Sequence, residues 1–265
     1  MSVHQLEAAF ARAAEEGRKA LMPFLMSGHP ANAAFESNLE AAGAIADVIE
    51  VGVPFSDPLA DGPVIQAAAA QALAGGTTLA KTLDVLQRRR PGPPVVLMLS
   101  FNQVLAGGVE RFVARAANAG VSGAIIPDLP FEEQGDLREL FASRDIALIP
   151  MLAPTTNEAR MRAILERAQG FVYLISVAGV TGARDAYPAG TIDYIRKAQS
   201  LSPVPVCVGF GISKPAHIEK LYEHAEGFIV GSALVRGLER GESVARILKP
   251  LRAACDAALA TGTQS

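Results

Sequence analysis

Tryptophan is absent from the 265-residue sequence, cysteine occurs only twice, and charged residues make up only 19% of the chain. Cys207 and Cys255 are far apart, and two cysteines in a chain of this length do not form a disulfide framework, so we expect both to be reduced packing residues. The 24 basic and 27 acidic residues leave a net charge of -3, which gives no electrostatic footprint for nucleic acid. Hydrophobic residues make up 50% of the chain, enough for a sizeable core, so a globally disordered chain is excluded.

Long apolar runs are missing as well. Stretches such as 95–99 and 146–152 are far shorter than the ~18 residues that indicate a membrane span. Near the amino terminus, Glu7, Arg12 and Glu15 interrupt any hydrophobic segment that a signal peptide would need. We therefore expect a cytoplasmic protein with no membrane partner.

Short β-rich apolar runs alternate with longer amphipathic stretches along the chain, as in repeated βα units with a parallel sheet. Strands are predicted near residues 20–26, 46–52, 94–99, 123–126, 146–150, 171–175, 204–208 and 227–230. Helices are predicted near residues 3–16, 31–43, 63–75, 78–90, 108–119, 132–143, 157–168, 190–200, 214–224 and 242–258. The length alone allows two small domains or one large one. Eight βα units without a Ser-rich or Pro-rich linker favour one α/β domain over residues 1–265, a closed (β/α)8 TIM barrel with an additional N-terminal helix.

A carboxylate stands in the second predicted strand among β-branched residues. Glu50 would be costly there if it were charged and unpaired in a buried strand. With period-two alternation Val48, Glu50 and Gly52 share a face, and we expect Gly52 to leave space above Glu50 at the mouth of the barrel. Because reactive groups of such barrels project from the carboxyl ends of strands, Glu50 is a candidate to reach a ligand. The alternative is a structural glutamate paired with a cation distant in sequence.

The loop that follows, residues 54–63, contains two aspartates. Asp57 precedes Pro58 as a turn residue and Asp61 suits the N-cap of the next helix, which would be ordinary loop chemistry. In the other interpretation, Glu50 and Asp61 place two carboxylates over one mouth for general acid and base work.

Glycine-rich patches follow the last three predicted strands, at residues 178–184, 209–213 and 231–233. Glycine permits close backbone approach, and free amides at the start of a short helix after Gly231 would favour an anion, so we expect a phosphate site there. The first patch suits a mobile lid, and plain turn glycines are the alternative for each patch. The lysines, with Lys214 as the exception, lie away from the predicted strand exits, and the four histidines lack metal-ligand spacing, which favours carboxylate chemistry without a Schiff base or a metal.

The segment at residues 49–63, IEVGVPFSDPLADGP, closely resembles the signature of the tryptophan synthase alpha chain family. Supporting matches span nearly the whole chain and are Pro23-Phe24 with Gly28 and Pro30, Pro127-Asp128-Leu129-Pro130, Ala178-Gly179-Val180-Thr181-Gly182 and Gly209-Phe210-Gly211-Ile212. The resemblance implies a carbon–carbon lyase that cleaves indole-3-glycerol phosphate to indole and glyceraldehyde 3-phosphate by a retro-aldol reaction. One departure is Ser100-Phe101-Asn102, where the family often has tyrosine at the first position, so an aromatic contact is lost or moves to Phe101.

By position, the resemblance implies that Glu50 is the general acid/base and that Asp61 holds the indole nitrogen. It also implies that Thr181, in the lid, hydrogen-bonds Asp61 when the loop closes. The remaining implied substrate-binding residues are Phe24, Ile65, Leu99, Tyr173 and Phe210 around the indole, and Gly182, Gly211, Gly231 and Ser232 at the phosphate.

The resemblance further implies a partner, the beta chain, in an α2β2 tetramer. Pyridoxal phosphate would belong to that partner, and no cofactor is expected in this chain. Asp57, Pro58 and Asn102 are expected in loops that face the beta chain. Two alternatives stay open: a self-sufficient lyase that releases free indole, and a weakly catalytic regulatory subunit, against which the intact Glu50, Asp61 and Thr181 argue.

Overall fold

The computed structural model describes residues 3–58, 61–175, 189–209 and 211–257. Within these residues, nine parallel strands form one curled sheet in the order β5-β4-β3-β2-β1-β9-β8-β7-β6. The strands are β1 (Ala20–Met26), β2 (Ile49–Gly52), β3 (Val95–Met98), β4 (Val121–Ile125), β5 (Ala147–Leu148), β6 (Met151–Leu152), β7 (Val172–Ile175), β8 (Val206–Gly209) and β9 (Gly227–Val230).

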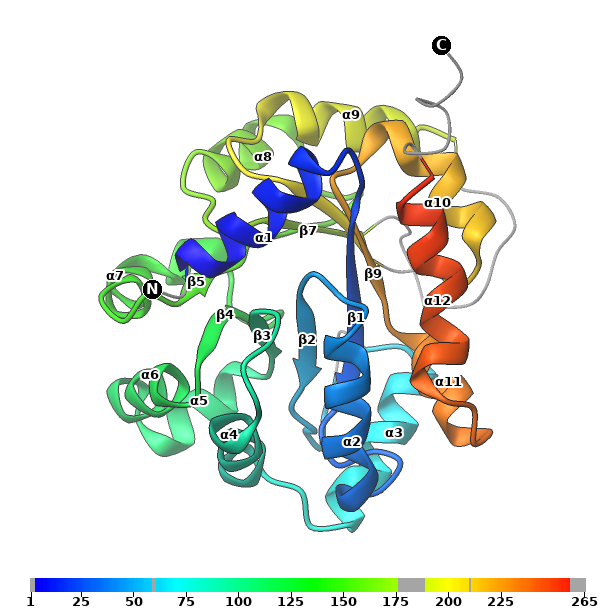
Figure 1. Cartoon of the computed structure of the whole chain (residues 1–265). Coiled ribbons are helices and arrows are strands. Elements are labelled where there is room, and N and C mark those ends of the chain that lie inside the picture. Colours follow the sequence, from blue (N-terminus) through cyan, green and yellow to red (C-terminus); the bar gives the residue numbers. More distant parts are fainter. Residues whose placement is uncertain (1–2, 59–60, 176–188, 210, 258–265) are drawn as a thin grey trace.

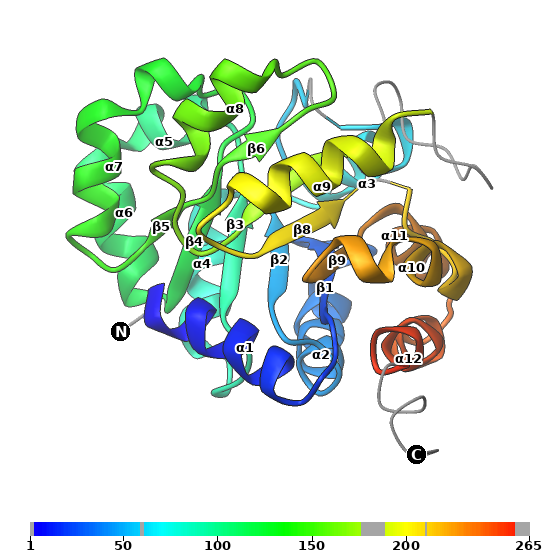
Figure 2. The same cartoon turned by 90° about the horizontal axis from the view of Figure 1, so that it is seen from above.

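Helices surround the sheet, as Figures 1 and 2 show from two directions. The α-helices are α1 (Val3–Glu15), α2 (Asn32–Gly43), α3 (Pro63–Ala74), α4 (Leu79–Arg88), α5 (Phe101–Gly107), α6 (Val109–Asn118), α7 (Gly135–Ala142), α8 (Glu158–Leu165), α9 (Thr191–Leu201), α10 (Pro215–Leu221), α11 (Ser232–Glu239) and α12 (Val244–Cys255). The described residues also form the short 3-10 helices η1 (Phe131–Glu133) and η2 (Tyr222–His224). None of the described helices is long and apolar enough to cross a membrane.

The strands β5 and β6 are two pieces of one barrel strand. Between them, the Ile149 N–H donates to the carbonyl oxygen of Ala124 at 2.9 Å, and the Pro150 carbonyl oxygen accepts from the Tyr173 N–H at 2.9 Å. Proline has no N–H to donate, which interrupts the ladder at this point. The prediction of one unbroken strand over 146–150 was therefore wrong. The bonds to both neighbours close the sheet, which confirms the predicted TIM barrel, whereas a single domain over all 265 residues stays a prediction.

Helix α5 was missed in the sequence. The Ser100 hydroxyl accepts from the Asn102 N–H at 3.3 Å, and Gln103 Oε1 accepts from the Ser100 N–H at 3.1 Å. This Ser-x-x-Gln capping box was the available signal for a helix start. Asn102, which was expected in a loop, lies instead in the first turn of α5.

Side chains alternate along the strands between two apolar layers. In β1, Met22 and Phe24 point into the barrel, while Leu21 and Leu25 pack against the outer helices. Helix α1, dark blue in Figure 1, contributes Leu6 and Phe10 to the interior cluster, and the Phe10 ring lies 5.7 Å from that of Phe171. The additional N-terminal helix thus closes the barrel interior at the end opposite to the carboxyl ends of the strands.

An ion-pair cluster ties the amino-terminal side of the barrel together. The buried carboxylate of Asp47 accepts from Arg18 Nη1 at 2.6 Å, from Arg252 Nη1 at 2.6 Å and from the Leu21 N–H at 2.9 Å. These residues come from the segments before β1 and β2, from β1 itself and from α12, so one carboxylate joins the two ends of the described chain. Cys207 and Cys255 are free and buried, as expected.

Candidate active site

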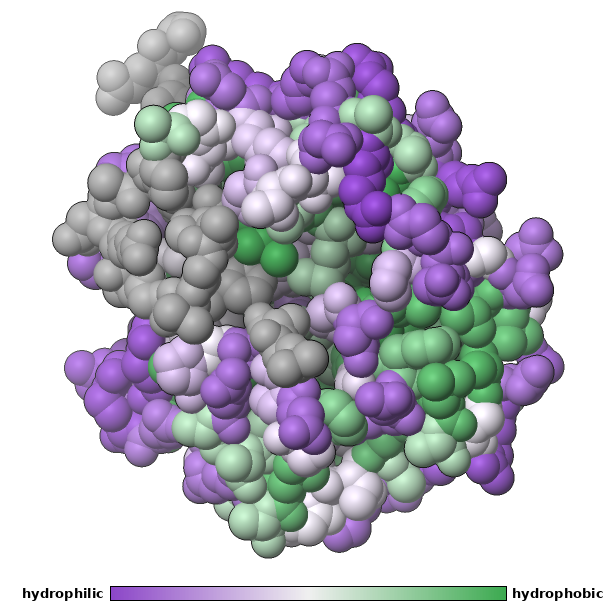
Figure 3. All heavy atoms as spheres, turned by 180° about the vertical axis from the view of Figure 1, so that it is seen from behind, coloured by the Kyte–Doolittle hydropathy of each residue, from purple (hydrophilic) through white to green (hydrophobic). Residues whose placement is uncertain are grey.

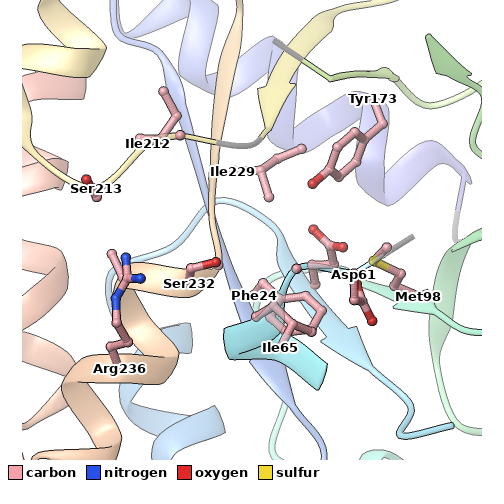
Figure 4. Close-up of a pocket in the computed structure, with 15 residues that line it drawn as sticks. Phe24, Asp61, Ile65, Met98, Tyr173, Ile212, Ser213, Ile229, Ser232 and Arg236 are labelled. Carbon is pink, nitrogen blue, oxygen red and sulfur yellow. The ribbon is translucent and has the colours of Figure 1, made fainter. Parts of the chain in front are cut away.

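A narrow cavity opens at the carboxyl ends of the strands and brings Glu50 and Asp61 together. Glu50 lies in β2 opposite Phe24 of β1, and Asp61 lies two residues before α3. Figure 4 shows Asp61, Met98 and Tyr173 on one side of this cavity and Ser213, Ser232 and Arg236 on the other. The cavity is lined by Phe24, Glu50, Asp61, Gly62, Ile65, Met98, Tyr173, Gly211, Ile212, Ser213, Ile229, Gly231, Ser232, Ala233 and Arg236.

Glu50 is a buried carboxyl group without an ion-pair partner among the described residues. Its side chain is buried, and its Oε1 makes no hydrogen bond with any described residue. Burial, followed by the negative charge of Asp61, raises the pKa of Glu50 from 4.5 to about 8. No described cation pairs with it, so the structural alternative finds no support in this part of the chain. At neutral pH the carboxyl group holds a proton that it can donate.

Asp61 does not cap the following helix. The N-cap residue of α3 is Gly62, and none of the described side chains caps that helix. The Asp61 carbonyl accepts from Gln66 Nε2 at 2.9 Å, which fixes the backbone while the carboxyl group lines the cavity. Burial raises the pKa of Asp61 from 3.8 to about 6, so Asp61 ionises at lower pH than Glu50. Two carboxyl groups with separated pKa values can act as an acid and an anion at the same pH.

Gly52 makes room for an aromatic ring rather than for an open space above Glu50. A Cβ atom at Gly52 would lie 2.4 Å from Cζ of Phe24. The expectation of free space above Glu50 was therefore wrong: the Phe24 ring occupies it. This ring supplies apolar surface beside the carboxyl group and contributes to its burial.

Tyr173 faces both carboxyl groups from β7. Burial, followed by the charges of Glu50 and Asp61, raises the pKa of its phenol, which stays neutral. A Cβ atom at Gly209, on the neighbouring strand β8, would lie 2.4 Å from the phenol oxygen. Glycine at that position is required for the ring to lie where it does.

The other end of the cavity is built from backbone. Helix α11 begins at Ser232 after Gly231, and no described side chain caps its first turn. Gly211 lies opposite with a φ of 87°, a backbone conformation that favours glycine. Uncapped N–H groups at a helix start attract an anion. Gly211, Gly231 and Ser232 are therefore brought together where the sequence analysis expected a phosphate.

Leu99 does not line this cavity. It belongs to the outer apolar layer and lines a second, adjoining cavity of about 540 Å³. Met98, one residue earlier, faces the interior and lines both cavities. Phe24 and Asp61 are also shared between the two cavities, and the second one extends to Asp57, Pro58, Ser100 and Asn102.

The sequence departure after β3 has a structural role. Ser100 Oγ donates to Asp128 Oδ2 at 2.6 Å, and the Phe101 N–H donates to Asp128 Oδ1 at 2.8 Å. The Phe101 ring packs against the outer apolar layer rather than entering either cavity. Phe101 therefore does not supply the aromatic contact that the family's tyrosine at position 100 would make.

Several site residues were predicted and others were missed. Phe24, Ile65 and Tyr173, which were predicted to lie around the indole, line the first cavity. Thr181, Gly182 and Phe210 lie outside the described residues. Sequence reasoning missed Met98, Ile229 and Arg236, although Met98 has the strand parity of Val96 and Arg236 lies one helical turn after Ser232.

The barrel and its paired carboxyl groups define a class: barrel enzymes whose acid and base groups project from the carboxyl ends of strands. No cluster of three or more metal-ligating side chains is present in the described ranges. The family model for the tryptophan synthase alpha chain matches residues 10–261. The chain belongs to the tryptophan synthase alpha chain family, whose members are lyases.

Individual relatives match most of this chain and most of their own length. The tryptophan synthase alpha chain of Nitratidesulfovibrio vulgaris strain Hildenborough is 47% identical over 252 residues, covering 94% of this chain and 98% of the relative. That of Carboxydothermus hydrogenoformans is 47% identical and covers 87% of both chains. Among solved structures, Mycobacterium tuberculosis tryptophan synthase has a TM-score of 0.83 at 34% identity, with 98% of both chains covered. A mutant alpha-subunit from Pyrococcus furiosus has a TM-score of 0.80 at 35% identity, covering 88% of this chain and 96% of that one.

Proposed function

We propose that this chain is a carbon–carbon lyase that cleaves indole-3-glycerol phosphate to indole and glyceraldehyde 3-phosphate, and that it passes indole to a beta subunit. The observation that carries the proposal is the cavity itself. It holds a protonated carboxyl group and a more acidic one at its apolar end, and uncapped helix N–H groups at the other end. The substrate has a matching distribution of groups, an aromatic ring at one end and a phosphate at the other.

Glu50 is proposed to move the protons. Its carboxyl group donates a proton to C3 of the indole, which leaves a cationic ring with a C2=N1 double bond. The carboxylate that results takes the proton of the adjacent side-chain hydroxyl, whose oxygen then forms the aldehyde. The bond from C3 to the glycerol chain breaks, and its electron pair returns to the ring. Glu50 donates one proton and takes up one proton in each cycle, so it is regenerated as the acid.

Asp61 is proposed to stabilise the cation that forms on the ring. Because the pKa of Asp61 is lower than that of Glu50, it is ionised under conditions in which Glu50 is still protonated. A carboxylate beside the indole N–H opposes the positive charge that develops there. Thr181, which lies outside the described residues, is proposed to orient this carboxylate, and Phe210 and Gly182 to complete the ring and phosphate contacts.

The adjoining cavity supports a proposal for the partner. It leads from Asp61 and Met98 to Asp57, Pro58 and Asn102, the residues expected to face the beta chain. On the carboxyl-end face, apolar side chains gather on one side, visible in green in Figure 3, and Leu105 of α5 is 51% exposed. We propose an α2β2 complex in the cytoplasm, with pyridoxal phosphate in the beta subunit and with this cavity as the route for indole.

The experiment is to measure indole release from indole-3-glycerol phosphate by the purified chain, alone and with a beta chain. Because the chain has no tryptophan, its own fluorescence does not obscure the product. Slow release that rises sharply with the beta chain is the expected result. Fast release by the chain alone would favour a self-sufficient lyase. No release in either case would contradict the lyase and leave the regulatory subunit.

A further inference from the structure

Arg236 is a charged group in the cavity that the proposed proton transfers do not use. It lies in the second turn of α11, four residues after Ser232, and its side chain is partly buried. Figure 4 shows the Arg236 guanidinium rising toward Ser213 and Ser232. Residues four apart on a helix share a face, so the side chain lies beside the uncapped helix start.

The arginine has no carboxylate partner among the described residues. Arg240, the C-cap residue of α11, pairs with Glu242 at 2.6 Å, and Arg246 pairs with Glu242 at 3.5 Å. Arg236 forms no such ion pair in the described ranges. The N–H groups of its guanidinium therefore form no ion pair with a described carboxylate and can bind an anion in the cavity.

The cavity has charge of opposite sign at its two ends. Glu50 and Asp61 lie at one end, and Arg236 is the one cation among the described lining residues. A helix start offers only about half an elementary charge, whereas a phosphate monoester carries about two negative charges at neutral pH. Asp61, once ionised, adds electrostatic repulsion of the phosphate. A full positive charge beside the helix start offsets this imbalance.

We propose that Arg236 is the specificity-determining residue for a doubly charged phosphate monoester at the α11 end of the cavity. The backbone N–H groups at Gly231 and Ser232 shape the anion site, and Arg236 selects the dianion over neutral or singly charged groups of similar size. A guanidinium pairs well with phosphate oxygens, because its planar donors match their geometry. This inference rests on the proposed function for the identity of the whole substrate, but it concerns the anion alone.

The test compares Arg236→Gln with Arg240→Gln as a matched control. Arg240 is exposed, paired with Glu242 and absent from the lining of the first cavity. We expect Arg236→Gln to raise the KM for indole-3-glycerol phosphate about tenfold with little change in kcat, since a charge-assisted hydrogen bond of this kind acts equally before and during the reaction. Arg240→Gln should stay within about twofold of the wild type, because exposed ion pairs contribute little.

A binding measurement separates this inference from the proposed function. Calorimetry with glycerol 3-phosphate, and with glycerol as the neutral probe, needs no turnover. The expected result is about tenfold weaker glycerol 3-phosphate binding by Arg236→Gln, partial recovery in Arg236→Lys and a smaller salt dependence in Arg236→Gln. If that result holds while no variant or wild type releases indole, Arg236 keeps its role and the lyase is wrong. Equal binding by wild type and Arg236→Gln, or no binding by the wild type, overturns the inference.

Discussion

The phenol of Tyr173 occupies the space that any side chain at Gly209 would need. A Cβ atom there would lie 2.4 Å from the phenol oxygen and 2.5 Å from two of the ring carbons. The same arrangement recurs in another pair of neighbouring strands, where the Phe24 ring of β1 lies against Gly52 of β2. In both pairs an aromatic side chain at the cavity leans onto a glycine of the next strand, so the glycines fix where the rings lie.

Substituting Gly209 should therefore disturb the site through Tyr173. Gly209→Ala places a methyl group where the ring lies, so the ring must shift toward the carboxyl groups or the strands must separate. We expect kcat/KM for indole release to fall about tenfold or more, in line with overpacking costs of about 1–3 kcal/mol. Gly135→Ala is the control, because no atom of the described residues lies within 4 Å of a Cβ atom there. Comparable activity of Gly209→Ala and the control would show that the position of the ring is not critical.

Glu50 should carry a stability cost as well as the proton. Its pKa rises from 4.5 to about 8 in the folded chain, so between these values the unfolded chain releases the proton while the folded chain retains it. Stability is thus reduced progressively as pH rises through this window, on the order of a few kcal/mol in total. Glu50→Gln removes the ionisable group. We expect this variant to release almost no indole and to have a higher Tm than the wild type at pH 8, with a smaller difference at pH 5.

Thermal unfolding followed by circular dichroism checks the second half of that expectation. Glu139→Gln, on the surface helix α7, is a control with the same chemical change. A Tm gain for Glu50→Gln that does not depend on pH would mean that burial does not perturb the carboxyl group. Unchanged indole release would remove Glu50 from the chemistry.

The pH dependence of turnover should reflect both carboxyl groups. The productive form has Glu50 protonated and Asp61 ionised, which requires a pH between about 6 and about 8. We expect kcat/KM to decline on either side of this window. Asp61→Asn should slow the reaction strongly and move the alkaline decline to lower pH, because the charge of Asp61 contributes to the raised pKa of Glu50.

A rate profile over pH 5 to 10 for wild type and Asp61→Asn gives the measurement. Residual turnover by the variant with an alkaline limb at the wild-type position would argue against electrostatic coupling of the two carboxyl groups. A normal rate would leave Asp61 without a role in the reaction.

The Asp47 cluster should matter for stability but not for catalysis. Asp47→Asn leaves Arg18 and Arg252 without their shared anion, and breaking a buried ion pair costs about 3 kcal/mol or more. Asp84→Asn is the matched control, because the ion pair of Asp84 with Arg115 is exposed and contributes at most ~1 kcal/mol. Urea unfolding gives both values. Equal losses in the two variants would show that the Asp47 cluster is no stronger than a surface pair, and kcat should be unaltered in both.

Much of the fold could be predicted from the sequence because short apolar runs mark the buried parallel strands and the amphipathic stretches between them mark the helices. The exceptions have local causes. Pro150 cannot donate to the ladder, so an apolar run that reads as one strand is divided. Helix α5 is a short apolar segment without clear periodicity, and only the capping box of Ser100 and Gln103 indicates where it begins.

The site was less accessible to sequence reasoning, because it depends on which atoms meet. The carboxyl pair was recognised from its motif. Whether Met98 or Leu99 faces the barrel interior depends on which face each side chain takes at the end of β3. The position of the Phe24 ring against Gly52 could be known only from the register of β1 with β2. Arg236 belongs to a helix with an ordinary surface pattern, and only its neighbours identify it as a cavity residue.

The Asp47 cluster has a consequence for biosynthesis. Arg18 and Asp47 leave the ribosome before Arg252, which follows more than two hundred residues later. The same delay applies to the pairing of β1 with β9. A nascent chain therefore holds a half-neutralised Asp47 carboxylate and a β1 edge without its β9 partner until β9 and α12 have been made.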